Sequence, residues 1–310
     1  MRTFFLATVV VLLFAGGYLA GRWATGPDSE PADDNVAERP PPQRIVSTAP
    51  NLTEVLFALG VGDRVVGVTP YCNHPPQARD LPKIGGLLDP NFEALVALEP
   101  DLVVLLQSAA HHRPALERLG LKTLVVPHRN LEGMLQAITM LGTAVGREEQ
   151  AERIVADFRK RLGRVEQRVA GRGRPRVLVV IERDYAAGLD SMTVAASDAS
   201  YDLYDRVIEI AGGQNACPRT AAPFPPVSTE GLLWMNPEVI VELVPPAAER
   251  SLDLEAIRRQ WQELPELEAV KNGRVYVIDD DFAMIPGPRF VRLIEKLAKL
   301  LHPEVEWRAD

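Results

Sequence analysis

The pattern of apolar and charged positions between Glu148 and Val169 predicts one long helix. Apolar or small residues recur at steps of three and four, which places them on one helical face, and charged residues fill the other face. Gly146 and Gly171 bracket the stretch. At about 1.5 Å per residue the helix is roughly 33 Å long. That length suits a connector between two lobes, although a surface helix of one large domain fits the same pattern.

Short apolar segments alternate with helical patterns on both sides of this stretch. Before it, strands are predicted at residues 45–47, 65–68, 102–106 and 123–126. After it, strands are predicted at 176–181, 239–241 and 275–278, with helices at 204–211 and 292–301. Asn51 is predicted to cap the first helix, with Glu54 reaching back to it. The alternation predicts a small parallel α/β lobe on each side of the long helix.

A weak internal repeat relates the two sides. Glu93 and Glu230 are each followed by a leucine, a proline, an acid and an apolar run, all at a constant offset of 137 residues. Each copy predicts a helix capped by Asn91 or Ser228, ended by proline and followed by a buried strand. Chance similarity is the alternative. The symmetric position about the long helix favours two similar α/β lobes joined by one helix.

Composition narrows the class of protein. The 310 residues suffice for two packed lobes, and the net charge of −8 argues against a nucleic-acid partner. The two cysteines, Cys72 and Cys217, belong to no CxxC pair, which argues against a zinc knuckle or a thioredoxin-type site. Two free thiols are favoured over a disulfide between the lobes.

The N-terminal pattern predicts export. Residues 4–20 are apolar or small and follow Met1 and Arg2, which fits either a signal peptide or a retained membrane anchor. A hydrophobic hairpin of a cytosolic protein is the remaining alternative. No cysteine follows the run, so lipoprotein processing is not expected. The predicted organisation is a signal peptide or anchor (1–24), a disordered acidic, proline-rich linker (25–43), a first lobe (44–146), a connecting helix (147–171) and a second lobe (172–310).

Candidate ligand-binding residues lie in loops at the predicted strand ends. Two facing α/β lobes leave a cleft between them, and ligands bind where such loops meet. Tyr71, Phe224 and Phe282 are candidates for apolar walls, with core packing as the alternative for each, and Gln107 and Asp281 are candidates for polar contacts. The same loops add four further candidates: Pro50, Asn51, His74 and Leu87.

These segments carry a resemblance to a known family. The matching stretches are STAPNLTEVLFALGVGDRVVGVT, YCNHPP and NFEALVALEPDLVV in the first half, and IEIAGGQN, FPPVSTEGLLWMNPEVIV and NGRVYVIDDDFAMIPGPR in the second. Together they span about Arg44 to Pro303. They resemble periplasmic substrate-binding proteins of the helical-backbone class, the receptors for cobalamin, siderophores and haem that serve ABC importers. The likeness is nearest to the cobalamin-binding type.

The resemblance implies a monomeric periplasmic receptor with small hinge motion, anchored in the inner membrane if the N-terminal segment is retained. It implies that the receptor delivers a corrinoid, cobalamin or cobinamide, to a permease dimer with its ATPase. It also implies that Glu93 and Glu230 dock on arginines of that dimer, and that Tyr71, Phe224 and Asp281 contact the ligand. Two exposed carboxylates at equivalent positions suit a symmetric basic partner. First-turn acids favoured by the helix dipole are the alternative.

Some features keep other ligands open. Leu87 and Leu106 stand where cobalamin binders of this type tend to carry tryptophans, which leaves cobinamide-like corrinoids, haem or a ferric siderophore as candidates. A bare metal needs three or four ligands from both lobes, but the second half offers only His302 as a histidine. His74 or Cys72 either touches the metal of a bound chelate or is a solvated loop residue.

Motifs of catalysis are missing from the sequence. No GxSxG, Walker lysine or GxGxxG accompanies a predicted strand–helix turn. We therefore expect no catalytic residues, no resident metal and no cofactor, the cobalt or iron being part of the ligand. An enzyme or an anchored scaffold protein on the same fold is the alternative class.

Overall fold

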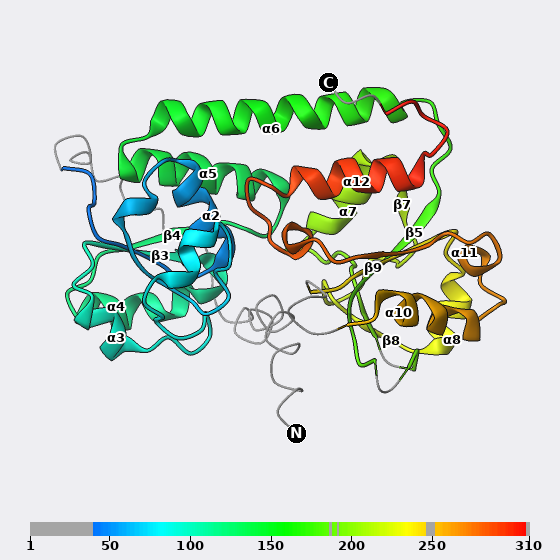
Figure 1. The fold of residues 1–310 in the computed structure, drawn as a ribbon, viewed down its shortest axis with the longest axis horizontal. Helices are drawn as coiled ribbons and strands as arrows, with labels where there is room; N and C mark the ends of the chain where they lie inside the picture. The colour runs from blue at the N-terminus through cyan, green and yellow to red at the C-terminus, as the bar shows by residue number, and fades with distance from the viewer. Residues whose placement is uncertain (1–39, 186–187, 191, 246–251, 308–310) are drawn as a thin grey trace. The chain divides into compact units, whose positions relative to one another are not determined.

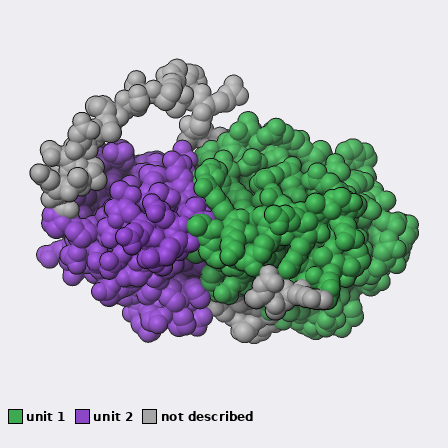
Figure 2. All heavy atoms as spheres, turned by 90° about the horizontal axis from the view of Figure 1, so that it is seen from above, with its two compact units in different colours: residues 1–12, 129–134, 156–310 green, residues 13–128, 135–155 purple. Residues whose placement is uncertain are grey.

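The computed structural model describes residues 40–185, 188–190, 192–245 and 252–307. The predicted signal peptide or anchor, and the predicted linker up to residue 39, lie outside the described residues. The described chain forms two compact units (Figure 2). Residues 40–128 and 135–155 make up the N-terminal unit, and residues 129–134 with the described residues from 156 onwards make up the C-terminal unit. None of the helices described has both the length and the apolar character needed to cross a bilayer.

The N-terminal unit is built on a four-stranded sheet in the order β2-β1-β3-β4. Two of its strands, β3 and β4, are labelled in Figure 1. All neighbouring strands are parallel, as the alternation of elements predicts. The strands are β1 (Ile45–Ser47), β2 (Val65–Val68), β3 (Leu102–Leu106) and β4 (Thr123–Val126). The helices are α2 (Pro50–Ala58), α3 (Phe92–Ala97), α4 (Arg113–Arg118) and α5 (Leu131–Val145), with 3₁₀ turns η3 (Gly62–Arg64), η4 (Pro76–Asp80) and η5 (Gln107–His112). The first residues of α5, 131–134, belong to the C-terminal unit.

The C-terminal unit is built on a six-stranded sheet in the order β10-β9-β5-β6-β8, with β7 also paired to β5. The strands are β5 (Arg176–Arg183), β6 (Met192–Val194), β7 (Gln214–Asn215), β8 (Pro226–Val227), β9 (Val239–Leu243) and β10 (Val275–Ile278). The helices are α7 (Leu203–Ile210), α8 (Thr229–Met235), α10 (Leu254–Gln260), α11 (Glu268–Lys271) and α12 (Val291–Leu301), with 3₁₀ turns η6 (Trp261–Glu263) and η7 (Asp281–Met284).

The second sheet differs from the prediction at one edge. β5, β7, β9 and β10 are parallel, but β6 is antiparallel to β5 and β8 is antiparallel to β6. β6 and β8 have three and two residues, too few to show a periodicity of two in the sequence. The α/β class is confirmed, with a mixed rather than purely parallel sheet in this unit.

The long helix is confirmed as α6 (Glu148–Val169). Gly146 and Gly171 on either side have φ values of 68° and 73°, the left-handed conformation that glycine adopts without strain and that ends helices. Residues 148–155 of α6 belong to the N-terminal unit and residues 156–169 to the C-terminal unit. The predicted cap of the first helix is wrong. Ala49 is the N-cap of α2 without a side-chain bond, because Pro50 occupies the first helical position and Asn51 is buried in the first turn.

The internal repeat extends to backbone geometry. β3 and β9 begin at Leu102 and Val239, 137 residues apart. Glu99 and Asn236, at the same offset, both adopt the left-handed conformation, with φ values of 44° and 40°. The repeated helix therefore ends in the same turn in each unit before its proline.

The acid after each repeated proline has the same partner. Asp101 accepts hydrogen bonds from the backbone of Gln43 and Arg44 (2.7 and 3.0 Å), and Glu238 accepts one from the backbone of Arg176 (2.7 Å). The side chain of Arg44 donates to the carbonyl of Leu98, at the C-terminal end of α3. The side chain of Arg176 likewise donates to the carbonyl of Met235, the last residue of α8. An arginine at the start of the first strand of each unit, directly before β1 and as the first residue of β5, thus satisfies a carbonyl group at the end of the repeated helix.

Candidate ligand-binding loops and docking helices

Three loops of the N-terminal unit follow adjacent parallel strands and therefore lie at one edge of its sheet. β1 is paired with both β2 and β3, so the residues after each strand come close together. Pro50 and Tyr71, after β1 and β2, are half-buried, and Gln107, the first residue after β3, is exposed. Three of the residues predicted to contact a ligand therefore follow strands at this edge of the sheet.

The loop that carries Tyr71 and His74 is anchored from within by Cys72. The thiol is fully buried, and its sulfur lies 3.1 Å from Oγ1 of Thr53 in α2 and 3.2 Å from Oγ1 of Thr69. Burial raises the pKa of the Cys72 thiol, while these hydroxyl contacts oppose the rise. Cys72 is therefore neither solvated nor reactive. It fixes the loop so that Tyr71 and His74, both half-buried, stand beyond it.

Leu87 is buried rather than exposed for contact with a ligand. It lies in a loop whose start pairs with the end of β2, through a bridge between Val68 and Lys83. His112, at the end of η5, is hydrogen-bonded to the backbone of Leu87 and Leu88, and burial lowers the pKa of its imidazole. His112 is a residue that the sequence pattern did not single out. It ties η5 to the loop that holds Leu87.

Phe224 lies among aromatic rings of the C-terminal unit. Its ring centroid is 5.1 Å from that of Tyr201 and 6.2 Å from that of Tyr204, and the side chain is buried. Burial raises the pKa of both tyrosines. The hydroxyl of Tyr204 donates to the carbonyl of Ala283 in η7 (3.4 Å). Phe224 and the η7 loop are therefore brought close together, and Phe224 is part of the core, as the alternative interpretation of this aromatic holds.

The η7 loop places two arginines around Phe282. The guanidinium carbon atoms of Arg289 and Arg292 each lie 6.0 Å from its ring centroid. Arg289 also forms an ion pair with Asp281, its Nη1 lying 2.7 and 2.9 Å from the two carboxylate oxygens. Asp281 is thus engaged by Arg289. The two arginines were missed from the sequence, although Arg289 ends the last matched stretch, NGRVYVIDDDFAMIPGPR, and Arg292 follows three residues later.

Each predicted docking glutamate occupies the second position of a short capped helix. The Asn91 side chain accepts from the backbone N–H of Ala94 (3.0 Å), and Ser228 accepts from that of Gly231 (3.4 Å), which confirms both predicted caps. Glu93 and Glu230 are exposed. The hydrogen bond with Ser228 lowers the pKa of Glu230, which keeps its carboxylate ionised at neutral pH.

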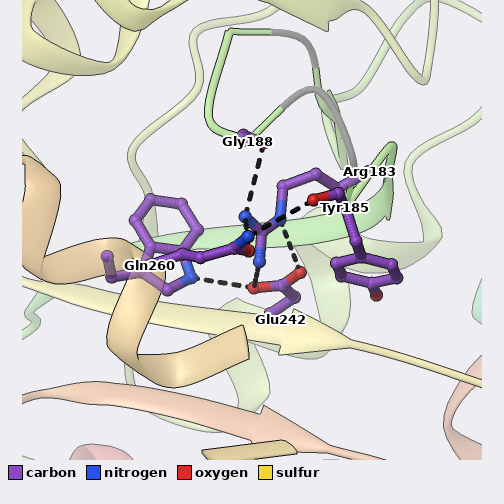
Figure 3. A network of polar contacts seen from close by, with 6 residues as sticks. Arg183, Tyr185, Gly188, Glu242 and Gln260 are labelled. Carbon is purple, nitrogen blue, oxygen red and sulfur yellow. Dashed lines mark hydrogen bonds and ion pairs between the residues drawn. The ribbon is translucent and has the colours of Figure 1, made fainter. Parts of the chain in front are cut away.

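A buried ion pair stands at the carboxyl end of β5, outside these loops (Figure 3). Arg183 binds Glu242 of β9 through two contacts of 2.9 and 3.2 Å, and their side chains are 0% and 1% exposed. Nε1 of Trp261 donates to Glu242 (2.8 Å), and Arg183 donates to the side-chain oxygen of Gln260 (2.8 Å) and the carbonyl of Gly188 (3.4 Å). Because the ion pair has hydrogen-bond partners on every side, we interpret this network as structural: it holds β5, β9 and α10 together.

The chain belongs to the periplasmic binding protein family, whose model matches residues 45–282. It is 26% identical over 288 residues to an ABC transporter substrate-binding lipoprotein of Bacillus subtilis, covering 88% of this chain and 84% of that protein. The homologues found are binding proteins rather than enzymes.

Two solved structures show the range of ligands among its relatives. The periplasmic vitamin B12-binding protein of Vibrio cholerae is 26% identical, with a TM-score of 0.71 over 86% of this chain and 98% of that one. A periplasmic haem-binding protein of Pseudomonas aeruginosa is 27% identical, with a TM-score of 0.73 over 86% of this chain and 95% of that one. The family and the α/β fold predicted from the sequence are therefore confirmed, and the ligand is not decided by likeness alone.

Proposed function

We propose that this protein is the periplasmic substrate-binding component of an ABC importer, and that its ligand is a corrinoid, cobalamin or cobinamide. The observation that carries the proposal is the likeness to the vitamin B12-binding protein over 98% of that protein's chain. The B. subtilis relative supports the assignment to an ABC importer. The N-terminal segment then serves as signal peptide or inner-membrane anchor, and the receptor acts as a monomer.

The strand-end loops supply chemistry that suits a corrinoid. A corrin ring is a broad, largely apolar plate edged with amide side chains. Tyr71 and Phe282 offer aromatic faces for the plate, and Gln107 offers an amide that donates to and accepts from peripheral amides. The other six predicted contact residues lie beside or beneath these side chains in the proposal: Pro50, Asn51, His74, Leu87, Phe224 and Asp281.

A second candidate ligand is haem or a ferric siderophore, and one observation favours it. Arg289 and Arg292 both lie over the ring of Phe282, and Arg292 is exposed. Guanidinium groups suit the carboxylates of haem or the anionic groups of a siderophore better than the neutral amides of a corrinoid. The likeness to a haem-binding protein agrees with this candidate.

Calorimetric titration of the purified protein with cyanocobalamin, dicyanocobinamide, haemin and a ferric siderophore separates the candidates. We expect a dissociation constant of about 1 μM or below for one of the corrinoids, and about tenfold or more loss of affinity in Tyr71→Ala. Arg292→Ala is the matched variant, because it weakens haem or siderophore binding and leaves corrinoid binding unchanged. Binding of haemin or the siderophore alone would replace the corrinoid by the second candidate. No heat with any of the four would refute both.

We also propose that Glu93 and Glu230 dock the receptor on basic residues of a permease dimer. Both carboxylates are exposed and stand at equivalent positions of α3 and α8. A dimer with two-fold symmetry presents the same basic group twice, and charge-assisted hydrogen bonds to two carboxylates give it a defined position.

A further inference from the structure

The repeated helices share more than a glutamate on their exposed face. Val96 and Leu233 stand three positions after Glu93 and Glu230 and are each 41% exposed. Residues three apart lie on the same side of a helix, so each carboxylate has an apolar neighbour beside it. The buried side of each helix is also alike, since Leu95 and Leu232 are fully buried.

α8 carries one residue that breaks the likeness. Trp234 is 75% exposed, while the equivalent position of α3 is Ala97. Trp234 is four positions after Glu230 and therefore on the same side of α8. Among the large hydrophobic residues described, it is by far the most exposed, the next being Leu119 at 49%. A side chain of this size left in water costs free energy that a partner surface recovers.

We infer that Leu233 and Trp234 form the apolar centre of the docking surface on α8, and that Trp234 anchors this half of the receptor on an apolar pocket of the permease. The inference rests on the proposed docking function and deepens it. Tryptophan is the residue type most enriched among those that dominate interface energies, and a charged neighbour such as Glu230 stands at the polar rim. The α8 half of the contact is therefore tighter than the α3 half.

The charge of the α8 docking surface favours a permease as its partner over a lipid surface or a second copy of this chain. Glu230 stays ionised beside Trp234 and is repelled by an anionic lipid surface. A second copy of this chain would bring Glu230 against Glu230, within proteins that each carry a net charge of −8. A permease surface with a basic group next to an apolar pocket can bind the carboxylate of Glu230 and the ring of Trp234 at the same time.

The test measures binding of the ligand-loaded receptor to its permease–ATPase complex in proteoliposomes, with empty vesicles of the same lipids in parallel. We expect Trp234→Ala to weaken binding at least about tenfold, through faster dissociation and with little change in salt dependence. Trp234→Phe restores most of the affinity. Leu119→Ala, which truncates the next most exposed large hydrophobic residue described and lies on the other unit, leaves binding unchanged. Calorimetry confirms that every variant keeps the ligand affinity of the parent.

Each outcome bears on one of the two proposals. Unchanged binding by Trp234→Ala, together with loss in Glu93→Ala/Glu230→Ala, overturns the apolar anchor and leaves docking through the carboxylates in place. Unchanged binding by the double glutamate variant overturns the docking role itself. Binding to empty vesicles that Trp234→Ala abolishes assigns the residue to lipid. Concentration-dependent dimers in sedimentation that disappear in Trp234→Ala assign it to self-association, and either result overturns the inference.

Discussion

Arg183 and Glu242 hold opposite charges where almost no water reaches them. Removing each ion from water costs several kcal/mol, and mutual attraction offsets this only if the remaining donors and acceptors are bonded. Here the carboxylate also accepts from Trp261, and the guanidinium also donates to Gln260 and Gly188. The pair is therefore tolerated because the network around it is complete.

Removing one member of the pair leaves the other as an uncompensated buried charge. We expect Arg183→Met to lower the free energy of unfolding by about 3–5 kcal/mol. Glu242→Gln keeps an acceptor for Trp261 but leaves the guanidinium charge unpaired, with a loss of similar size. The double variant restores neutrality, so its loss is smaller than the sum of the two single losses by at least about 1 kcal/mol. Urea unfolding of the four proteins measures this difference, and additive losses would contradict the argument.

At the residue scale, the sequence identifies loop residues better than it identifies their partners. Tyr71 and Gln107 stand beyond strand ends as predicted, because the apolar runs that form β2 and β3 are evident in the sequence. That Cys72 is buried was not predictable from a loop rich in turn residues, since its contacts with Thr53 and Thr69 are tertiary. The arginines around Phe282 were missed for the same reason. Their roles depend on how a 3₁₀ turn folds back on α12, which no local periodicity encodes.

At the scale of elements, α6 is held against α12 by a half-buried ion pair. Arg161 donates to both carboxylate oxygens of Glu295, at 2.8 and 2.7 Å. Burial raises the pKa of Glu295, but the hydrogen bond and charge of Arg161 outweigh it, so the net shift is downward. Two charges in this bidentate arrangement are worth more than an ordinary surface pair.

The direction of this shift fixes the pH dependence of the pair. Because the pKa of Glu295 is lower in the folded than in the unfolded chain, the pair stabilises the fold above the ordinary value of about 4.5. That contribution disappears as the pH falls through the folded pKa. We expect Glu295→Gln to cost about 1 kcal/mol at pH 7 and progressively less below pH 4.5. Denaturant unfolding of both proteins from pH 3 to pH 7 measures the difference. Glu132→Gln, which removes an exposed partner of Arg159, serves as the control with little effect.

Element positions were predictable where a pattern has enough residues to repeat. The strands of the N-terminal unit and α6 have the predicted bounds, because apolar runs and a 22-residue helical stripe leave few alternatives. β6 and β8 were missed because strands of three and two residues are too short to show a periodicity of two. The predicted cap of α2 was wrong because Pro50 takes the first helical position, so the N-cap is Ala49, two residues before Asn51.

At the scale of the whole molecule, the internal repeat corresponds to the same arrangement of strand, helix and hydrogen bonds in both units. In each, an arginine at the start of the first strand donates to a carbonyl at the end of the repeated helix, and an acid accepts a hydrogen bond from that arginine's backbone N–H. The repeat of acid, proline and left-handed turn thus has a structural cause in both units. Glu93 and Glu230, in contrast, are both exposed, and the hydrogen bond of Glu230 with Ser228 lies within the cap of its own helix. Their repetition is better explained by a partner that meets both units in the same way.

Two equivalent contacts with one symmetric partner act as a bivalent attachment. The factors by which loss of each contact weakens the affinity for the permease should therefore multiply. We expect Glu93→Ala and Glu230→Ala each to weaken docking on the permease several-fold, and the double variant to weaken it by about the product of the two factors, with transport falling accordingly. Ligand affinity stays unchanged in all three, because neither residue lies in the strand-end loops. Glu132→Gln is the matched control for loss of one exposed negative charge. Transport assays with the permease–ATPase complex, paired with calorimetry of the ligand, separate the two effects. If the double variant transported as well as the parent, the glutamates would be ordinary first-turn acids stabilised by the dipoles of their own helices.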